Sequence, residues 1–229
     1  MLSEYTNQVQ QHLNDQQGQF FPAPTLHNFI NRSRRRVAAA SGCLRLLVKT
    51  TTIPNQEIYP FSAWNSQVQT DLPGARSVLA VRSVSIAIGV GGWKPMWHRI
   101  VWSDFQARFR IYNGAYYGVI SEPGWWAQFG DGQYGSIYLA PIPGAKMPME
   151  LDLSCVPQNL LTDNDPEPIP YPWVDAVSYW AAVLALMQQQ RAQDAQMMAT
   201  MFNTDMPFAA AVVCPTMLQT PYGAVIRSA

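Results

Sequence analysis

The residues best suited to chemistry lie close together, between positions 122 and 131. The segment GWWAQFG contains Trp125, Trp126 and Phe129, with Glu122 just before it and Asp131 just after it. Exposed aromatic rings beside two carboxyl groups are typical of sites that bind a sugar and cleave a glycosidic bond. Neighbouring residues of a β-strand point to opposite faces, so at least one tryptophan should be buried. We therefore expect these aromatic side chains to pack a sheet or a subunit interface, and we keep a carbohydrate-binding or peptidoglycan-cleaving protein as the alternative.

Other catalytic patterns are missing from the sequence. It contains neither a GxSxG serine motif nor a GxxxxGK[ST] phosphate loop. The histidines are scattered, at His12, His27 and His98, and the cysteines lie far apart without a CxxC pair, at Cys43, Cys155 and Cys214. The glycine-rich run at 130–135 is more typical of a hairpin turn than of a phosphate site. The sequence therefore predicts a protein that is not an enzyme and that holds no cofactor and no metal.

The composition is poor in charge. Hydrophobic residues make up 48% of the 229 residues and charged residues only 13%, about half the usual share. So few charges protect a monomer's surface poorly, which indicates that other subunits cover much of it. The formal net charge is zero, so the composition gives no reason to expect nucleic-acid binding. The first residues, MLSEYTNQVQQ, lack the basic and apolar regions of a signal peptide, and we expect synthesis in a reducing cytoplasm.

The longest element that could position such residues is a helix predicted over 172–202. This run contains no glycine and is rich in Ala, Leu, Met and Gln, and Pro172 suits a first helical turn. Its small side chains, Ala181 and Ala185 among them, would let another backbone approach closely, so we expect this face at a subunit interface. Asp175 and the polar run at 188–191 leave too few apolar residues for a membrane span, which needs about twenty.

Two shorter helices are predicted within residues 1–43. Apolar residues recur at helical spacing in the first of them, at Leu2, Tyr5, Val9 and Leu13, with Ser3 as the expected N-cap. The second helix should begin at Thr25 and end at Gly42. Four arginines fall largely on its polar side, namely Arg32, Arg34, Arg35 and Arg36. They indicate either a solvated or salt-bridged face, or a contact to an acidic partner or to DNA phosphate.

The pattern of residues 44–165 is that of a mainly antiparallel sheet. Alternating or β-branched runs predict strands at 44–53, 78–89, 135–141 and 149–154. Ser103 and Gln106 form a weak capping box for a short helix at 103–110, and the dipeptide Asn113-Gly114 is a turn signal.

Residues 203–229 are predicted to form an extended arm. Pro207, Pro215 and Pro221 should prevent a continuous helix. The short apolar runs between them suit docking on a partner chain, and their candidate contact residues are Phe208, Val212, Val213 and Tyr222. The whole sequence thus predicts an α+β fold: helices of a small bundle at 1–43, a β-rich insertion at 44–165, the long helix of the bundle at 166–202 and the extended C-terminal arm at 203–229.

Three segments resemble the head–tail adaptor, or connector, proteins of short-tailed bacteriophages. They are LHNFINRSRRRVAAASGCLR at 26–45, GSIYLAPIPGAKMPMELD at 135–152 and IPYPWVDAVSYWAAVLALMQQQRAQDAQMM at 169–198. The resemblance covers most of residues 25–202 and implies a helical bundle interrupted by a β-rich insertion. It also implies a dodecameric ring that docks beneath the portal protein and receives the tail nozzle, while DNA passes through the channel without sequence-specific binding. The protein would then be part of the virion, assembled in the cytoplasm of the host bacterium.

Overall fold

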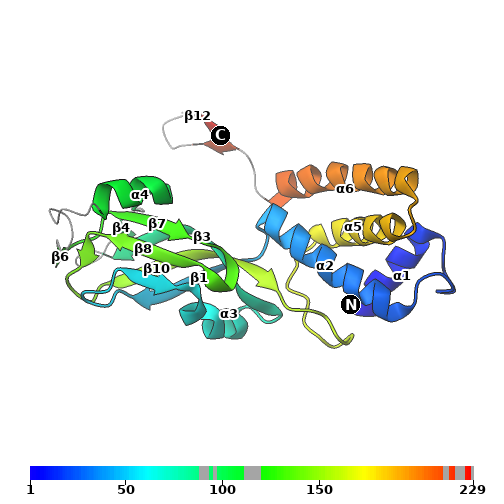
Figure 1. Cartoon of the computed structure of the whole chain (residues 1–229), viewed down its shortest axis with the longest axis horizontal. Coiled ribbons are helices and arrows are strands. Elements are labelled where there is room, and N and C mark those ends of the chain that lie inside the picture. Colours follow the sequence, from blue (N-terminus) through cyan, green and yellow to red (C-terminus); the bar gives the residue numbers. More distant parts are fainter. Residues whose placement is uncertain (88–92, 95–96, 111–119, 214–216, 220–224, 228–229) are drawn as a thin grey trace. The chain divides into compact units, whose positions relative to one another are not determined.

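The chain folds into two compact units. The computed structural model describes residues 1–87, 93–94, 97–110, 120–213, 217–219 and 225–227 (Figure 1). The helical unit consists of Met1–Cys43 and Asn159–Ala229, and the β unit consists of Leu44–Gln158. The helical unit is therefore built from two distant pieces of sequence, with the β unit inserted between them. The predicted fold class, α+β, is confirmed.

Within its described residues, the helical unit contains four helices: α1 (Leu2–Leu13), α2 (Ala23–Ser41), α5 (Trp173–Gln188) and α6 (Ala192–Val213). Helix α5 is central, because α1, α2 and α6 all pack against it. It is buried on almost every side, and its buried residues include Trp173, Val177, Ala181 and Ala185. The predicted apolar stripe of α1 is confirmed, since Leu2, Tyr5, Val9 and Leu13 are all buried.

The helix starts differ from the sequence-based expectation. Neither Ser3 nor Thr25 is an N-cap, because α1 begins at Leu2 and α2 begins at Ala23 after an extended Pro22. A proline within the first turn of α2 has no N–H to leave unpaired and its fixed φ suits the helix, so α2 begins before Thr25. The predicted end of α2 is confirmed, since Gly42 adopts the left-handed conformation with φ 60°.

The single long helix predicted over 172–202 is wrong, because the chain forms two helices there. Helix α5 ends at Gln188 and α6 begins at Ala192, and Gln190 between them has a positive φ of 61°. The run 188–191 is exposed, so nothing in the core holds it helical. The turn lets α6 fold back along α5, where the rings of Trp180 and Phe202 lie 5.0 Å apart. Tertiary packing outweighs the helical propensity of these four residues.

The extended arm predicted from residue 203 is also wrong in its first part. Helix α6 continues through Pro207 to Val213, so Phe208, Val212 and Val213 belong to a helix. Beyond it, the short strands β11 (Met217–Gln219) and β12 (Val225–Arg227) pair as an antiparallel ribbon. Tyr222 lies outside the described residues.

The β unit contains two four-stranded sheets. The first is antiparallel, in the order β1 (Arg45–Thr51), β10 (Pro148–Pro157), β3 (Ala75–Ala87) and β4 (Trp93–Lys94). The second has the order β2 (Ile58–Pro60), β8 (Ser136–Ala140), β7 (Trp125–Phe129) and β5 (His98–Arg99), with β5 parallel to β7. Val81 of β3 donates its N–H to Gln128 Oε1 of β7 at 3.1 Å, which joins the two sheets. The strands predicted at 44–53, 135–141 and 149–154 are confirmed, and the one predicted at 78–89 is confirmed as far as Ala87, since residues 88 and 89 lie outside the described residues.

Short elements complete the β unit. They are the 3₁₀ turns η1 (Phe61–Trp64) and η2 (Gly132–Tyr134), the helices α3 (Asn65–Asp71) and α4 (Trp102–Phe109), and the parallel pair β6 (Ile120–Ser121) and β9 (Ile142–Pro143). The short helix predicted near 103 is confirmed as α4, but it begins after Val101 without a side-chain cap, so the capping box of Ser103 and Gln106 is not formed. The turn signal at Asn113-Gly114 lies outside the described residues.

Candidate interaction surfaces

Both tryptophans of the aromatic motif pack against other residues of the β unit. Trp126 is fully buried and donates its indole N–H to the Trp97 carbonyl at 3.2 Å. Trp125 is half-buried, and its ring lies 4.9 Å from the His98 ring. The expectation that at least one of the two is buried is confirmed.

Helix α4 covers the face of the second sheet that carries Trp125. The core there consists of Phe105, Ala127 and Ala140, and the partly buried rings of Trp102, Phe109, Trp125 and Tyr138 pack around it. Stacked rings of Trp102 and Phe105 lie 5.8 Å apart within α4. These aromatic side chains therefore pack against one another, and Trp125 does not present an exposed ring face on which a sugar could stack.

The two carboxylates of the motif do not form a catalytic pair. Glu122 precedes β7 and Asp131 follows it, and the ends of this five-residue strand stand about 13 Å apart at about 3.3 Å per residue. Glycosidases hold their two carboxyl groups about 5 to 9.5 Å apart. Asp131 instead accepts a hydrogen bond from Gln128 Nε2 at 2.6 Å, in the predicted hairpin turn between β7 and β8. The glycosidase alternative loses its geometric basis.

The hairpin between β7 and β8 exposes other aromatic side chains. Phe129 at the end of β7 is 50% exposed, and Tyr134 in η2 is 82% exposed. A surface cavity of about 370 Å³ reaches this strand at Gln128. It is also lined by Arg99, Ile100, Val101 and Trp102. This end of the β unit offers apolar contact area with an adjacent arginine.

The four arginines of α2 do not share one environment. Arg34 is buried and forms a two-pronged ion pair with Glu167, with Nε–Oε2 at 2.8 Å and Nη2–Oε1 at 2.9 Å. The expectation that it lies on the polar side is wrong, because its partner is supplied by the segment that returns from the β unit. Arg32, Arg35 and Arg36 are exposed, as predicted.

Arg36 is held in place by an aromatic side chain. Its guanidinium lies 3.7 Å from the ring centroid of Trp180 on α5, which in turn packs against Phe202 on α6. Such a cation–π contact fixes the long side chain while leaving its hydrogen-bond donors free for another partner. Arg35 donates from Nε to the Asn31 carbonyl at 3.3 Å.

A second group of titratable residues lies where α1 and α6 meet α5. The His12 ring stacks on Tyr179 at 4.7 Å, and its Nε2 lies 3.2 Å from Ser178 Oγ. Burial lowers the pKa of His12, against the opposing effect of the Asp175 carboxylate. Burial and the charge of Asp175 together raise the pKa of Asp205. The two carboxylates are thus close enough to repel each other.

The small residues predicted at a subunit interface lie inside the helical unit. Ala181 and Ala185 are both fully buried, in the helix against which α1, α2 and α6 pack. The close backbone approach expected from their size occurs between helices of the same chain.

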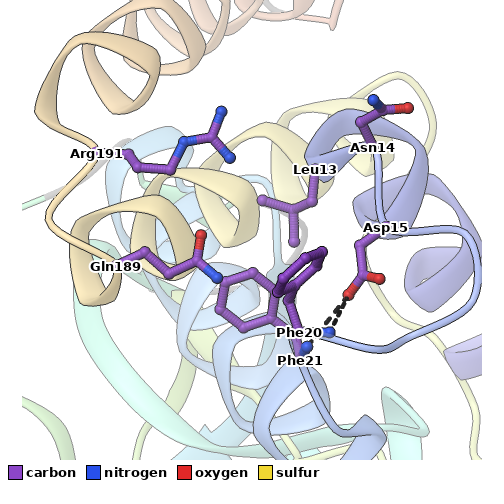
Figure 2. Close-up of a pocket in the computed structure, with 7 residues that line it drawn as sticks. All are labelled: Leu13, Asn14, Asp15, Phe20, Phe21, Gln189 and Arg191. Atoms are coloured by element: carbon purple, nitrogen blue, oxygen red, sulfur yellow. Dashed lines mark hydrogen bonds between the residues drawn. The ribbon is translucent and has the colours of Figure 1, made fainter.

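A pocket of about 320 Å³ opens where the loop after α1 meets the turn between α5 and α6 (Figure 2). It is lined by Leu13, Asn14, Asp15, Phe20, Phe21, Gln189 and Arg191. The Asp15 carboxylate accepts the backbone N–H of Gln19, Phe20 and Phe21 at 2.9, 3.0 and 3.1 Å, which fixes the loop. The guanidinium of Arg191 is paired with Asp194 at 2.8 Å. Sequence reasoning missed this site, although an aspartate directly after a helix and shortly before Gly18 is a turn signal.

Within the described part of the chain, no group of histidine, cysteine and carboxylate side chains could hold a metal ion. No helix of that part is long and apolar enough to cross a membrane.

Comparison with known proteins identifies one family. A family model described as SU10 adaptor protein matches residues 2–211. No curated protein matches the chain. Because the family model spans nearly the whole chain, the protein belongs to the SU10 adaptor protein family, a family of structural adaptor proteins of phage particles.

Proposed function

We propose that this chain is the ring-forming head-to-tail adaptor of a short-tailed phage, joining the portal protein to the tail nozzle or tail tube around the DNA exit channel. The observation that carries the proposal is the match to the SU10 adaptor family over residues 2–211. The ring is most simply a dodecamer, and DNA passes through it without sequence-specific contacts. The protein acts in the virion after assembly in the bacterial cytoplasm.

The surfaces of the two units support a role in assembly. The β unit exposes Phe129 and Tyr134 at its hairpin, which are side chains that gain most from burial against a partner. The helical unit exposes Phe20 at its pocket and Met187, Met197 and Met201 along α5 and α6. A chain with only 13% charged residues keeps such apolar area soluble most easily when partners cover it.

We further propose that the C-terminal region docks on a partner chain, with Phe208, Val212 and Val213 of α6 and Tyr222 beyond it as contact residues. A chain that lacks residues 214–229 keeps α6 complete and tests the part of this surface that lies beyond the helix and includes Tyr222. Unchanged thermal unfolding with lost portal binding is the expected result. A lower melting temperature with intact portal binding would assign these residues to the fold of the helical unit.

The proposed function is tested by mixing the purified chain with isolated portal rings and, separately, with isolated tail nozzles. Negative-stain images should show added ring-shaped density on both partners, and mass spectrometry of purified virions should detect the chain. A variant with Tyr134→Ala, at a side chain that is 82% exposed, should weaken attachment to one of the two partners. A folded wild-type chain that adds density to neither partner and is absent from the virion would refute the proposal.

A further inference from the structure

Charge is segregated by helix in the helical unit. Helix α2 contains four arginines and no Asp or Glu, whereas α1, α5 and α6 contain no Lys or Arg. The carboxylates of those three helices are Glu4, Asp175, Asp194 and Asp205. The surface of a soluble monomer usually mixes the two signs. The separation therefore needs a reason beyond solubility.

The arginine face consists of Arg32, Arg35 and Arg36, the exposed arginines of α2. In the part of the chain that the structure describes, no carboxylate lies within 4.0 Å of any of these three guanidiniums. The buried fourth arginine of the helix is already satisfied by Glu167. The stacking of Arg36 on Trp180 presents its donors outward at a lower cost in side-chain entropy. Apart from the Arg35 bond to the Asn31 carbonyl, the arginine face thus has donors in place and no carboxylate partner among the described residues.

The acid face consists of Asp175 on α5 and Asp205 on α6. Both carboxylates are partly exposed, and within the described residues no Lys or Arg lies within 4.0 Å of either. Burial lowers the pKa of His12 beside them, against the opposing effect of Asp175, and so disfavours the charged imidazolium that would balance these carboxylates. Burial and then the charge of Asp175 raise the pKa of Asp205, and a cation from another molecule would offset both effects.

The two faces are centred at different positions around α5. Arg36 marks the side of α5 at Trp180, and Asp175 lies five residues earlier on the same helix. At about 100° per residue, these two positions are about 140° apart around the α5 axis. A contact that joins two different faces of identical chains is heterologous, and it builds a ring or an open chain of subunits instead of a two-fold dimer.

We propose that the arginine face of one copy binds the acid face of the next copy. The inference rests on the proposed function, and it names the surfaces through which the helical units join. DNA phosphate is the weaker candidate for the arginine face, because the sequence of the helical unit holds six Lys and Arg residues against eight Asp and Glu residues. A second copy supplies the carboxylates that the first copy lacks beside α2.

The test reverses each face separately. Arg32→Glu with Arg35→Glu makes the arginine face negative, and Arg36 is kept because it packs on Trp180. Asp175→Asn with Asp205→Arg makes the acid face positive. The matched control is Arg76→Glu with Arg108→Glu, which changes net charge as the first variant does but at exposed positions of the β unit. Circular dichroism establishes that each variant is folded.

Self-association of the full chain is measured by sedimentation velocity at about 0.05 M and about 0.5 M salt, where the Debye length falls from about 14 Å to about 4 Å. We expect each face variant to associate at least tenfold more weakly than wild type at low salt, and the difference to shrink at high salt. The control should associate as wild type does. An equimolar mixture of the two face variants should associate again, because each then meets a complementary face.

Three results would overturn the inference: undiminished association of either folded face variant, an equal loss in the control, or no recovery in the mixture. A wild-type chain that stays monomeric up to about 1 mM would overturn it as well, since faces this weak would not join subunits (Kd of about 1 mM corresponds to about −4.1 kcal/mol). Portal attachment is scored on the same samples. Arginine-face variants that still self-associate but no longer attach to portal would refute the inference and leave the proposed function standing.

Discussion

The buried ion pair between Arg34 and Glu167 allows a sharp test of what holds the helical unit together. Its partners come from α2 and from the segment that returns from the β unit, 133 residues later. Both side chains are almost fully buried, with 1% and 2% exposed. Asn31 extends the network, because its Nδ2 donates to the Leu160 carbonyl at 3.0 Å and its Oδ1 accepts the Leu160 N–H at 2.8 Å. The pair thus anchors the returning segment to α2.

Replacing Arg34 by Met should be strongly destabilising. The substitution keeps the length of the side chain but leaves the carboxylate of Glu167 buried without its cation, while the N–H of Ile169 still donates to it at 3.0 Å. Removing one partner of a buried pair costs about 3–5 kcal/mol, because the other charge stays out of water. A loss of 1 kcal/mol lowers the melting temperature of a domain of about this size by about 4 °C. The melting temperature of the helical unit should therefore fall by about 12–20 °C.

The assay is thermal and urea unfolding followed by far-ultraviolet circular dichroism, which reports mainly the helical unit. Arg35→Met is the matched control, one residue away on the same helix but exposed, and it should cost no more than about 0.5 kcal/mol. Combining Arg34→Met with Glu167→Leu removes both charges and should recover most of the loss. The reasoning is refuted if Arg34→Met is no more harmful than Arg35→Met, or if the double variant is as unstable as the sum of the single ones.

Three further predictions follow from local geometry. Because burial lowers the pKa of His12, the unfolded chain binds a proton at a higher pH than the folded chain, so its contribution to stability should be lost as the pH falls below about 6.5, and His12→Gln should flatten the unfolding profile between about pH 7.5 and 5.5. A Cβ on Gly135 would lie 2.3 Å from Cε2 of the buried Phe61, so Gly135→Ala should cost about 1–3 kcal/mol in urea unfolding, whereas Gly124→Ala, which meets nothing within 4 Å, should be neutral. Pro207→Ala restores a backbone donor inside α6 and should raise helix stability by about 3 kcal/mol or less, and an unchanged melting temperature would mean that the helix frays before this residue.

Sequence periodicity predicted the features of this fold that depend on neighbouring residues, such as the buried face of a helix. The burial of Leu2, Tyr5 and Val9 follows from their spacing alone, because one face of a short amphipathic helix is a property of neighbouring residues. The strand at 149–154 was predicted for the same reason, but its burial does not alternate, because Asp152 is buried together with Leu151 and Leu153. That carboxylate is tolerated inside because Arg45 on β1 pairs with it across the sheet at 2.5 Å.

What depends on distant contacts could not be read from the sequence. Arg34 sits among three other arginines, and nothing nearby indicates that only this one faces a carboxylate far along the chain. The end of α5 at Gln188 is similar, because Gln189 and Arg191 are good helix formers and the turn forms only when α6 packs on α5. Pro207 led to the opposite error, because it was expected to prevent a helix that in fact continues through it. One missing hydrogen bond does not end a helix of 22 residues.

The arginines of α2 repel one another and so destabilise the helix, and no acidic residue on the helix offsets this repulsion. Arg32 and Arg36 are four residues apart and Arg32 and Arg35 three apart, so each pair places two like charges on neighbouring turns. Such pairs destabilise a helix by about 0.2–0.5 kcal/mol each, and no Glu or Asp on α2 compensates. Exchanging Arg32 for Glu would relieve both pairs while leaving the core untouched. A helix that retains three unbalanced exposed arginines, in a chain with so few charges, is better suited to a surface that meets carboxylates from outside its own subunit than to one that meets only water.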